Sequence, residues 1–277
     1  MARILLVYSG QATLPALEAV AALPWPGGAE CLLLATPRRR TEVAAAHEGL
    51  LHGLERLRAV VGEDGEVESS LREGPPAQLI QTAARELDAD LIALDAADGG
   101  AAGPYLLGPI ARAVAQQAER PVLALRAPLE QFDRVLLATD GTPPALRARD
   151  WLIAAPFPVG AETFVVAVAP PPLDFVWPTQ GEPLQETWYL PTFGSENRAL
   201  AHQLVEQEAA VIAASGREAR AEARQGSTTF QIVHAARQHQ INLVAMGARG
   251  LTGLAGALGS TSLHVLEYAP CSVLVVH

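Results

Sequence analysis

The sequence contains one structural unit twice, and this duplication limits the folds that the chain can adopt. Four stretches of the first half return, in the same order, in the second half: RILLVYSG (3–10) as RVLLATDG (134–141), PWPGGAECLLLA (24–35) as PFPVGAETFVVA (156–167), REGPPAQLIQTAARELDADLIAL (72–94) as RQGSTTFQIVHAARQHQINLVAM (224–246), and ERPVLAL (119–125) as PCSVLVV (270–276). Self-similarity of this kind is typical of tandem domains. We therefore predict one domain at 1–128 and a second at 132–277.

Each unit alternates short apolar runs with amphipathic stretches. The runs ILLVY, CLLLA, LIAL and VLAL are continuously apolar, which is typical of strands in a parallel sheet that is covered on both faces. Between them, apolar residues recur at helical spacing, as in 79–87. The alternation predicts an α/β fold with two tandem, doubly wound parallel sheets. In such sheets ligands bind beyond the carboxyl ends of the strands, where the strand order reverses.

The last strand of each unit predicts how the two units meet. PVLAL (121–125) and SVLVVH (272–277) are apolar, and in a doubly wound sheet of this order they lie at an edge. An exposed apolar edge favours aggregation, so proteins cover it or pair it. We expect the two edges to pair about a pseudo-twofold axis, which makes the chain an internal pseudo-dimer. A further homodimer of chains, through other surfaces, is also expected.

Composition excludes several functions. The chain has no lysine, so it contains neither a P-loop lysine nor a lysine that could form a Schiff base with pyridoxal phosphate. The net charge of −10 argues against a general nucleic-acid surface. No apolar run is long enough for a membrane span, and the two cysteines fit neither a disulfide framework nor a metal site. We expect a cytoplasmic protein that binds neither nucleic acid nor membrane.

One loop in the second unit is unusually rich in glycine and hydroxyl side chains. MGARGLTGLAGALGSTS (246–262) lies between the strand INLVAM and a predicted helix that begins at Ser260. The amino end of a helix presents unpaired N–H groups and about half a positive charge, so it attracts anions. Glycine lets an anion approach the backbone closely, and Arg249 adds a positive charge. The loop therefore predicts a phosphate-binding site.

These residues resemble the nucleotide loop of the universal stress protein family, whose pattern is Gly-x-x-Gly, nine residues, then Gly-Ser or Gly-Thr. RVLLATDGT is similar to that family's beginning and HVLEYAPCSVLVV to its ending, and the resemblance covers the chain twice. It implies Rossmann-like domains of the adenine nucleotide alpha hydrolase-like type and an ATP site in the second unit, with or without Mg²⁺ or Mn²⁺. The cofactor-binding residues that the resemblance implies are Ala138, Asp140, Val168, Met246, Gly247, Arg249, Gly250, Gly259, Ser260, Thr261 and Ser262.

The resemblance assigns these residues to three parts of ATP. Ala138, Asp140 and Val168 would contact the base and ribose. Met246, Gly247, Arg249 and Gly250 would line the ribose and first phosphates, and residues 259–262 would hold the outer phosphates. Only eight residues, 251–258, separate the second and third glycines, where the family pattern has nine. The loop of this chain is therefore one residue shorter than the family pattern, directly before the residues that would hold the outer phosphates.

The first unit departs from this pattern at every leading position. Ser9 replaces Asp140, Asp95 and Asp98 replace the two leading glycines, and Gly108–Pro109 replaces Gly259–Ser260. Two carboxylates would repel a triphosphate, and proline removes an N–H donor. We expect this unit to bind no ATP, although a metal bridging the two aspartates is an alternative.

Other functions stay open at this stage. The chain could be a slow ATPase or another nucleotide-hydrolysing enzyme, or an interaction protein without a nucleotide. The sequence shows no convincing nucleophile with its base and no metal-ligand spacing, so we assign no catalytic and no metal-binding residue. About 20 additional residues in the second unit fall in an aromatic, proline-rich segment, 170–197, which predicts either a loop packed on the protein or a flap over a ligand.

Overall fold

The structure is a computed structural model of the whole chain. It describes all residues except 63–64, 98–106, 127–131, 158–159, 171–190 and 249–257, which include the predicted site residues Arg249 and Gly250. The first domain runs β1 (Ala2–Tyr8), η1 (Gln11–Thr13), α1 (Leu14–Ala21), β2 (Ala29–Ala35), η2 (Arg40–Glu42), α2 (Val43–Val61), β3 (Glu66–Leu71), α3 (Pro76–Glu86), β4 (Leu91–Asp95), α4 (Pro109–Gln117) and β5 (Val122–Leu125).

The second domain repeats this order of helices and strands. It runs β6 (Arg134–Ala138), α5 (Pro143–Ala154), β7 (Glu162–Ala169), α6 (Pro191–Ala214), β8 (Glu218–Gln225), α7 (Thr228–Gln238), β9 (Leu243–Gly247), α8 (Ser260–Tyr268) and β10 (Ser272–Val276). The alternation of strands and helices that the sequence predicts is therefore confirmed in both halves. Most of the aromatic segment 170–197 lies outside the described residues, and its last part begins α6.

All ten of these strands form a single sheet in the order β3-β2-β1-β4-β5-β10-β9-β6-β7-β8. Within each domain every strand pair is parallel, whereas β5 and β10 pair antiparallel, with Leu123 opposite Leu274. Read outward from the β5–β10 boundary, the two domains therefore have equivalent strand orders, β5-β4-β1-β2-β3 and β10-β9-β6-β7-β8. The predicted edge-to-edge pairing is confirmed, and the tandem domains form an internal pseudo-dimer.

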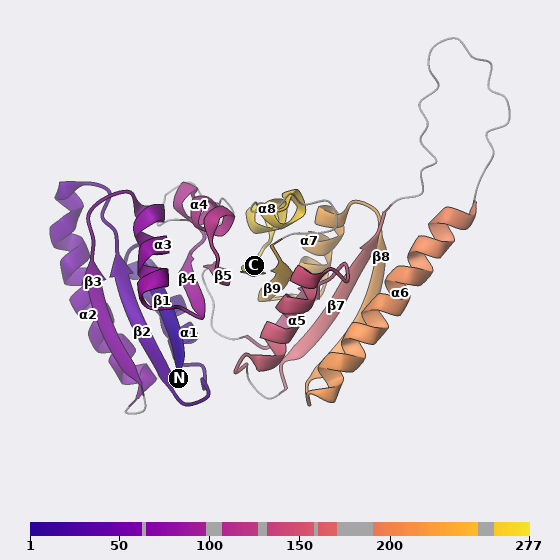
Figure 1. The fold of residues 1–277 in the computed structure, drawn as a ribbon, viewed down its shortest axis with the longest axis horizontal. Coiled ribbons are helices and arrows are strands. Elements are labelled where there is room, and N and C mark those ends of the chain that lie inside the picture. The colour runs from indigo at the N-terminus through magenta and orange to yellow at the C-terminus, as the bar shows by residue number, and fades with distance from the viewer. Residues whose placement is uncertain (63–64, 98–106, 127–131, 158–159, 171–190, 249–257) are drawn as a thin grey trace, which may run out of the picture.

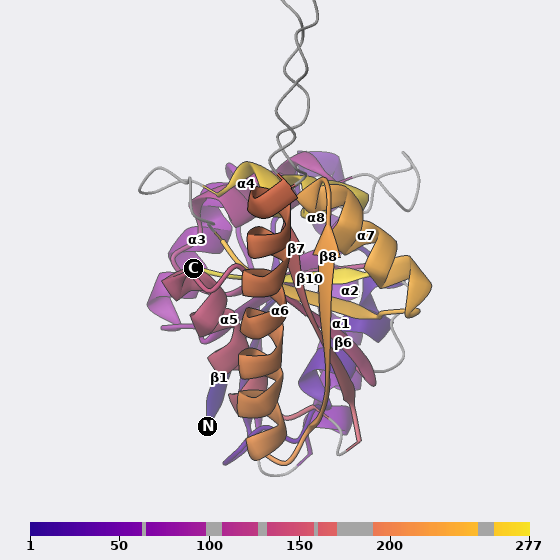
Figure 2. The same cartoon turned by 90° about the vertical axis from the view of Figure 1, so that its right-hand side faces the viewer.

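Helices cover both faces of the sheet, as expected for a doubly wound fold (Figures 1 and 2). One apolar core lies between the sheet and α1, α2, α5 and α6, and the other lies between the sheet and α3, α4, α7 and α8. Both cores continue across the domain boundary, because alternate residues of β5 and β10 enter opposite cores. None of the described helices combines the length and the apolar character that a membrane span requires.

We predict that proline at position 274 separates the two domains. Leu274 is fully buried, and β10 has a neighbour on both sides, so its N–H groups point into a ladder. Leu274→Pro removes one of these donors, and small-angle scattering should show a larger radius of gyration or aggregation. Leu274→Ile keeps the N–H and the volume and serves as the control. A soluble Leu274→Pro protein whose domains remain docked would contradict the pairing model.

Candidate functional site

In each domain the strand order changes direction at the first strand, β1 or β6, and in open α/β sheets ligands bind beyond the carboxyl ends of the strands at such a point. In the second domain β6 lies between β7 and β9, with Ala138 paired to Val166 and to Met246. These pairings bring Ala138 and Met246 together at the carboxyl ends of their strands. Val168 lies two residues after Val166 on β7. Three of the predicted site residues therefore belong to adjacent strand ends.

Asp140 is held in a tight turn between β6 and α5. Its Oδ1 accepts hydrogen bonds from the backbone N–H of Thr142 at 3.1 Å and from the hydroxyl of Thr142 at 2.6 Å. Gly141 has a positive φ of 73°, which glycine adopts without steric cost. The Asp140 side chain is thus oriented by the turn while its residue stays exposed at the crevice.

Gly247 ends β9, and its lack of a side chain has a packing reason. A Cβ at this position would lie 2.6 Å from the carbonyl carbon of Pro144 and 2.7 Å from the amide nitrogen of Ala145. Any side chain would therefore displace the first turn of α5 from the end of β9. The sequence resemblance predicts that Gly247 contacts a ligand. The structure gives a second reason for glycine here, because α5 packs closely against the end of β9.

The first turn of α8 is bonded to the end of β9 and to the residue that follows it. Gly259 is the N-cap residue with an extended backbone, and its N–H donates to the carbonyl of Ala248 at 2.7 Å. Ser260 is exposed and Thr261 is half-buried. Ser262 is only 2% exposed, and its hydroxyl donates to the carbonyl of Gly247 at 2.9 Å, which ties the helix to the strand.

The first domain has the same backbone arrangement with different side chains. The N–H of Gly108 donates to the carbonyl of Ala96 at 2.7 Å, which corresponds to the bond between Gly259 and Ala248. Pro109 then occupies the first position of α4, where α8 has Ser260. The Asp95 carboxylate accepts hydrogen bonds from the Ser9 hydroxyl at 3.3 Å and from the Ala97 N–H at 3.0 Å. The second aspartate of this pair, Asp98, lies outside the described residues.

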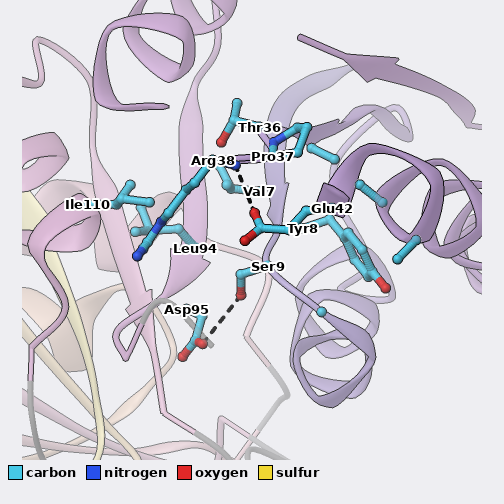
Figure 3. Close-up of a pocket in the computed structure, with 14 residues that line it drawn as sticks. Val7, Tyr8, Ser9, Thr36, Pro37, Arg38, Glu42, Leu94, Asp95 and Ile110 are labelled. Carbon is cyan, nitrogen blue, oxygen red and sulfur yellow. Dashed lines mark hydrogen bonds between the residues drawn. The ribbon is translucent and has the colours of Figure 1, made fainter. Parts of the chain in front are cut away.

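A pocket of about 400 Å³ opens at this crevice of the first domain (Figure 3). The carboxyl ends of β1, β2 and β4, the residues that follow β2 and the first turns of α2 and α4 enclose it. It is lined by Val7, Tyr8, Ser9, Gly10, Ala35, Thr36, Pro37, Arg38, Glu42, Ala45, Ala46, Leu94, Asp95 and Ile110. Sequence reasoning missed Arg38 and Glu42, although the charged run PRRRTE directly after a predicted strand was a signal for them.

Side chains of the first domain hold the carboxyl end of α8. Arg126 is 6% exposed, and its guanidinium donates to the carbonyl oxygens of Leu266 and Glu267. Burial lowers the pKa of Arg126, and the nearby Cys271 and Asp95 oppose this change. Arg112 of α4 forms an ion pair with Glu267, so α4 and α8 are joined across the domain boundary (Figure 1).

Neither cysteine is suited to be a nucleophile. Cys31 and Cys271 are both free and buried, and burial raises the pKa of each thiol to about 12. A thiolate is the reactive form of cysteine, so both groups are inert at neutral pH. His47 and His52 lie five residues apart in the stretch HEGLLH (47–52), and both are exposed on α2. Among the described residues, no three His, Cys, Asp or Glu side chains form a group that could hold a metal ion.

The chain is a tandem α/β protein whose two doubly wound domains pair through their last strands. Solved structures share this fold over almost the whole chain. A universal stress protein from Archaeoglobus fulgidus has a TM-score of 0.70 and 20% identity, over 99% of this chain and 95% of that one. A protein of unknown function from Pseudomonas aeruginosa has a TM-score of 0.64 and 17% identity, over 99% of this chain and 92% of that one. No curated protein matches the sequence. The sequence profile of the universal stress protein family matches residues 10–126 and 131–277, and the chain belongs to this family.

We predict that Arg126→Met lowers the free energy of unfolding by about 2 kcal/mol, because hydrogen bonds from a charged donor to buried carbonyls are lost. Arg147→Met is the matched control, since the Nε of Arg147 donates to the carbonyl of His277 at an exposed position. The control should change the free energy by less than about 0.5 kcal/mol. Urea denaturation measures both values, and equal losses would show that Arg126 has no special part in docking.

We predict that both cysteines resist alkylation in the folded protein. A folded pKa of about 12 leaves very little thiolate at pH 8, whereas the unfolded chain ionises near its ordinary pKa. Iodoacetamide at pH 8 should therefore label the protein in urea far faster than the native protein, as read by mass spectrometry. The same shift should lower stability as pH rises from about 8.5 toward 12, because only the unfolded thiols ionise in that window.

Proposed function

We propose that the protein is an ATP-binding universal stress protein whose second domain holds the nucleotide, and that the state of the bound nucleotide regulates a partner protein. The observation that carries this proposal is the first turn of α8 at the crevice of the second domain. Its N-cap glycine is followed by an exposed serine, and the Ser262 hydroxyl of this turn donates to Gly247 at the end of β9. Members of this family often bind ATP.

The described residues fit the three parts of ATP. Ala138 and Met246 are apolar and paired at their strand ends, where they would contact the adenine and ribose, with Val168 near the end of the adjacent strand β7. Asp140, fixed by the Thr142 turn, is an acceptor for hydroxyl or amino groups of the ligand. Arg249 and Gly250 belong to the proposed site by the sequence resemblance alone.

The phosphates would bind at the first turn of α8. The leading N–H groups of a helix have no partner within the helix, and its dipole places about half a positive charge there. Ser260 and Thr261 would supply N–H groups and two hydroxyls, while Gly259, whose own N–H donates to Ala248, would let the phosphates approach the backbone. Gly247 lets α5 pack close to the end of β9. Ser262 would act indirectly, because its hydroxyl fixes the turn to the Gly247 carbonyl.

The first domain lacks these features, which supports one ATP per chain. Pro109 has no N–H and no hydroxyl at the position of Ser260, and Asp95 places a carboxylate at the position of Gly247. A negative charge at this point opposes phosphate binding. Binding of ATP should therefore saturate at one nucleotide for each chain.

We predict that Ser260→Pro weakens ATP binding about tenfold or more without unfolding the protein. The change removes one N–H and one hydroxyl from the phosphate site, and hydrogen bonds to charged groups contribute about 1.5–3 kcal/mol each. Proline is favourable at the first position of a helix, as Pro109 in α4 illustrates. Isothermal titration calorimetry measures the affinity and the number of sites, and thermal unfolding checks the fold.

Pro109→Ser is the control, since it makes the reverse change in the first domain and should leave ATP affinity unaltered. Two equivalent ATP sites in the wild-type chain, or full affinity in Ser260→Pro, would overturn the proposal. The cytoplasmic location, the homodimer of chains and the domain limits 1–128 and 132–277 stay predictions.

A further inference from the structure

The sheet ends at β8, which among the described strands has a neighbour on one side only. Figure 2 views this end of the sheet, with β8 and α6 toward the viewer. A free edge presents backbone N–H and C=O groups that can pair with another strand. The sequence predicts a homodimer of chains through surfaces outside the β5–β10 boundary, and the edge of β8 is one such surface.

The outward backbone groups of β8 belong to every second residue. The N–H of Gly226 donates to the carbonyl of Ala169 on β7 at 3.0 Å, so the residues at even positions of β8 turn their backbone groups toward β7. Because the direction alternates along a strand, Ala219, Ala221 and Ala223 turn theirs outward. Within the described part of the chain, none of these three residues has a hydrogen bond on that side.

The charged side chains of β8 alternate in sign along one face of the strand, where alanines separate Glu218, Arg220, Glu222 and Arg224. An antiparallel copy of β8 centred on Ala221 places Arg220 of each chain opposite Glu222 of the other. It also places Glu218 opposite Arg224. Opposite charges that face each other across an antiparallel pair stabilise it, and like charges destabilise it. The strand is therefore complementary to a copy of itself.

Hydrogen bonding and charge select the same register. Pairing centred on Ala221 sets outward backbone groups opposite outward backbone groups, with Ala219 of one chain opposite Ala223 of the other, as an antiparallel ladder requires. A shift of the second copy by two residues keeps the ladder but brings Arg220 opposite Arg220, or Glu222 opposite Glu222. Like charges oppose both shifted registers.

The two central charged groups have capacity for a further partner. The Arg220 side chain is 70% exposed, and only its Nε pairs with Glu162, so the two other guanidinium nitrogens can donate across the edge. The Glu222 carboxylate contacts Arg224 and His239, and each of its oxygens can accept a further hydrogen bond. Both groups therefore keep their present contacts when a second copy pairs.

The opposite end of the sheet lacks this complementarity. β3 contains Glu66 and Glu68 and no positively charged residue, so charge does not favour pairing of β3 with itself. The carbonyl of Val67 also accepts a hydrogen bond from the guanidinium of Arg58 on α2 at 3.4 Å. A side chain thus already occupies part of that edge, and β8 is the edge suited to a second copy.

We propose that two copies of this chain form a symmetric dimer through antiparallel pairing of their β8 edges, with Arg220 of each copy opposite Glu222 of the other. An edge that pairs with itself about a twofold axis gives a closed dimer, whereas head-to-tail contacts give open filaments. The inference goes beyond the proposed function and does not depend on ATP binding.

Sedimentation equilibrium of the full-length chain measures the dimer and its charge pairing. Arg220→Glu and Glu222→Arg each set like charges opposite each other, and each should weaken dimerisation at least about tenfold. A mixture of the two variants should form a heterodimer, because the glutamates of one chain then face the arginines of the other. A chain that carries both substitutions should dimerise again for the same reason.

Ala221→Pro tests the ladder itself. It removes an outward N–H at the centre of the interface, a change that an edge strand tolerates, and should weaken dimerisation at least about tenfold while circular dichroism shows a folded chain. Ser69→Pro is the matched control, because Ser69 pairs with Leu33 on β3 as Ala221 pairs with Val165 on β8. It should leave dimerisation unchanged.

Each result decides the inference independently of the ATP site. A wild-type chain that remains monomeric would overturn it, as would a dimer that persists in both Ala221→Pro and Arg220→Glu. Association in the mixture of the two charge variants would support the proposed register, and its absence would overturn it. ATP affinity, measured by calorimetry on the same variants, should equal that of the wild type.

Discussion

The antiparallel pairing of β5 with β10 connects everything else in this molecule. Each domain ends in a short strand whose residues are almost entirely apolar, and neither strand would be stable at a solvent-exposed edge. Pairing them turns two five-stranded sheets into one, and it places alternate side chains into two cores that run through both domains. Arg126 and the ion pair between Arg112 and Glu267 then fix α8 against the first domain.

This docking has a consequence for the candidate site. The carboxyl end of α8 is held by Arg126 of the first domain, while its amino end forms the proposed phosphate site of the second. A cation at the carboxyl end of a helix is favourable because it opposes the negative end of the helix dipole. α8 therefore contacts the first domain at its carboxyl end and belongs to the proposed site of the second domain at its amino end.

The two domains illustrate how one backbone supports different chemistry. Gly108 and Gly259 make equivalent hydrogen bonds at 2.7 Å, so α4 and α8 begin in the same relation to the ends of β4 and β9. The two domains differ instead in a few side chains at the ends of these strands and at the start of these helices. Pro109 in place of Ser260 and Asp95 in place of Gly247 change the charge and the donors of the crevice without changing its position in the fold.

The sequence by itself determined the duplication, the α/β class and the pairing of the last strands, because periodicity and repeated motifs are local properties of the chain. Only the tertiary structure decided what individual side chains do. Gly247 must be glycine because α5 packs against it, and the Ser262 hydroxyl is engaged by a strand carbonyl. Arg38 and Glu42 join Asp95 around one pocket, although Asp95 is more than 50 positions from either in the chain. Such contacts join segments that are distant in sequence, so no local pattern carries them.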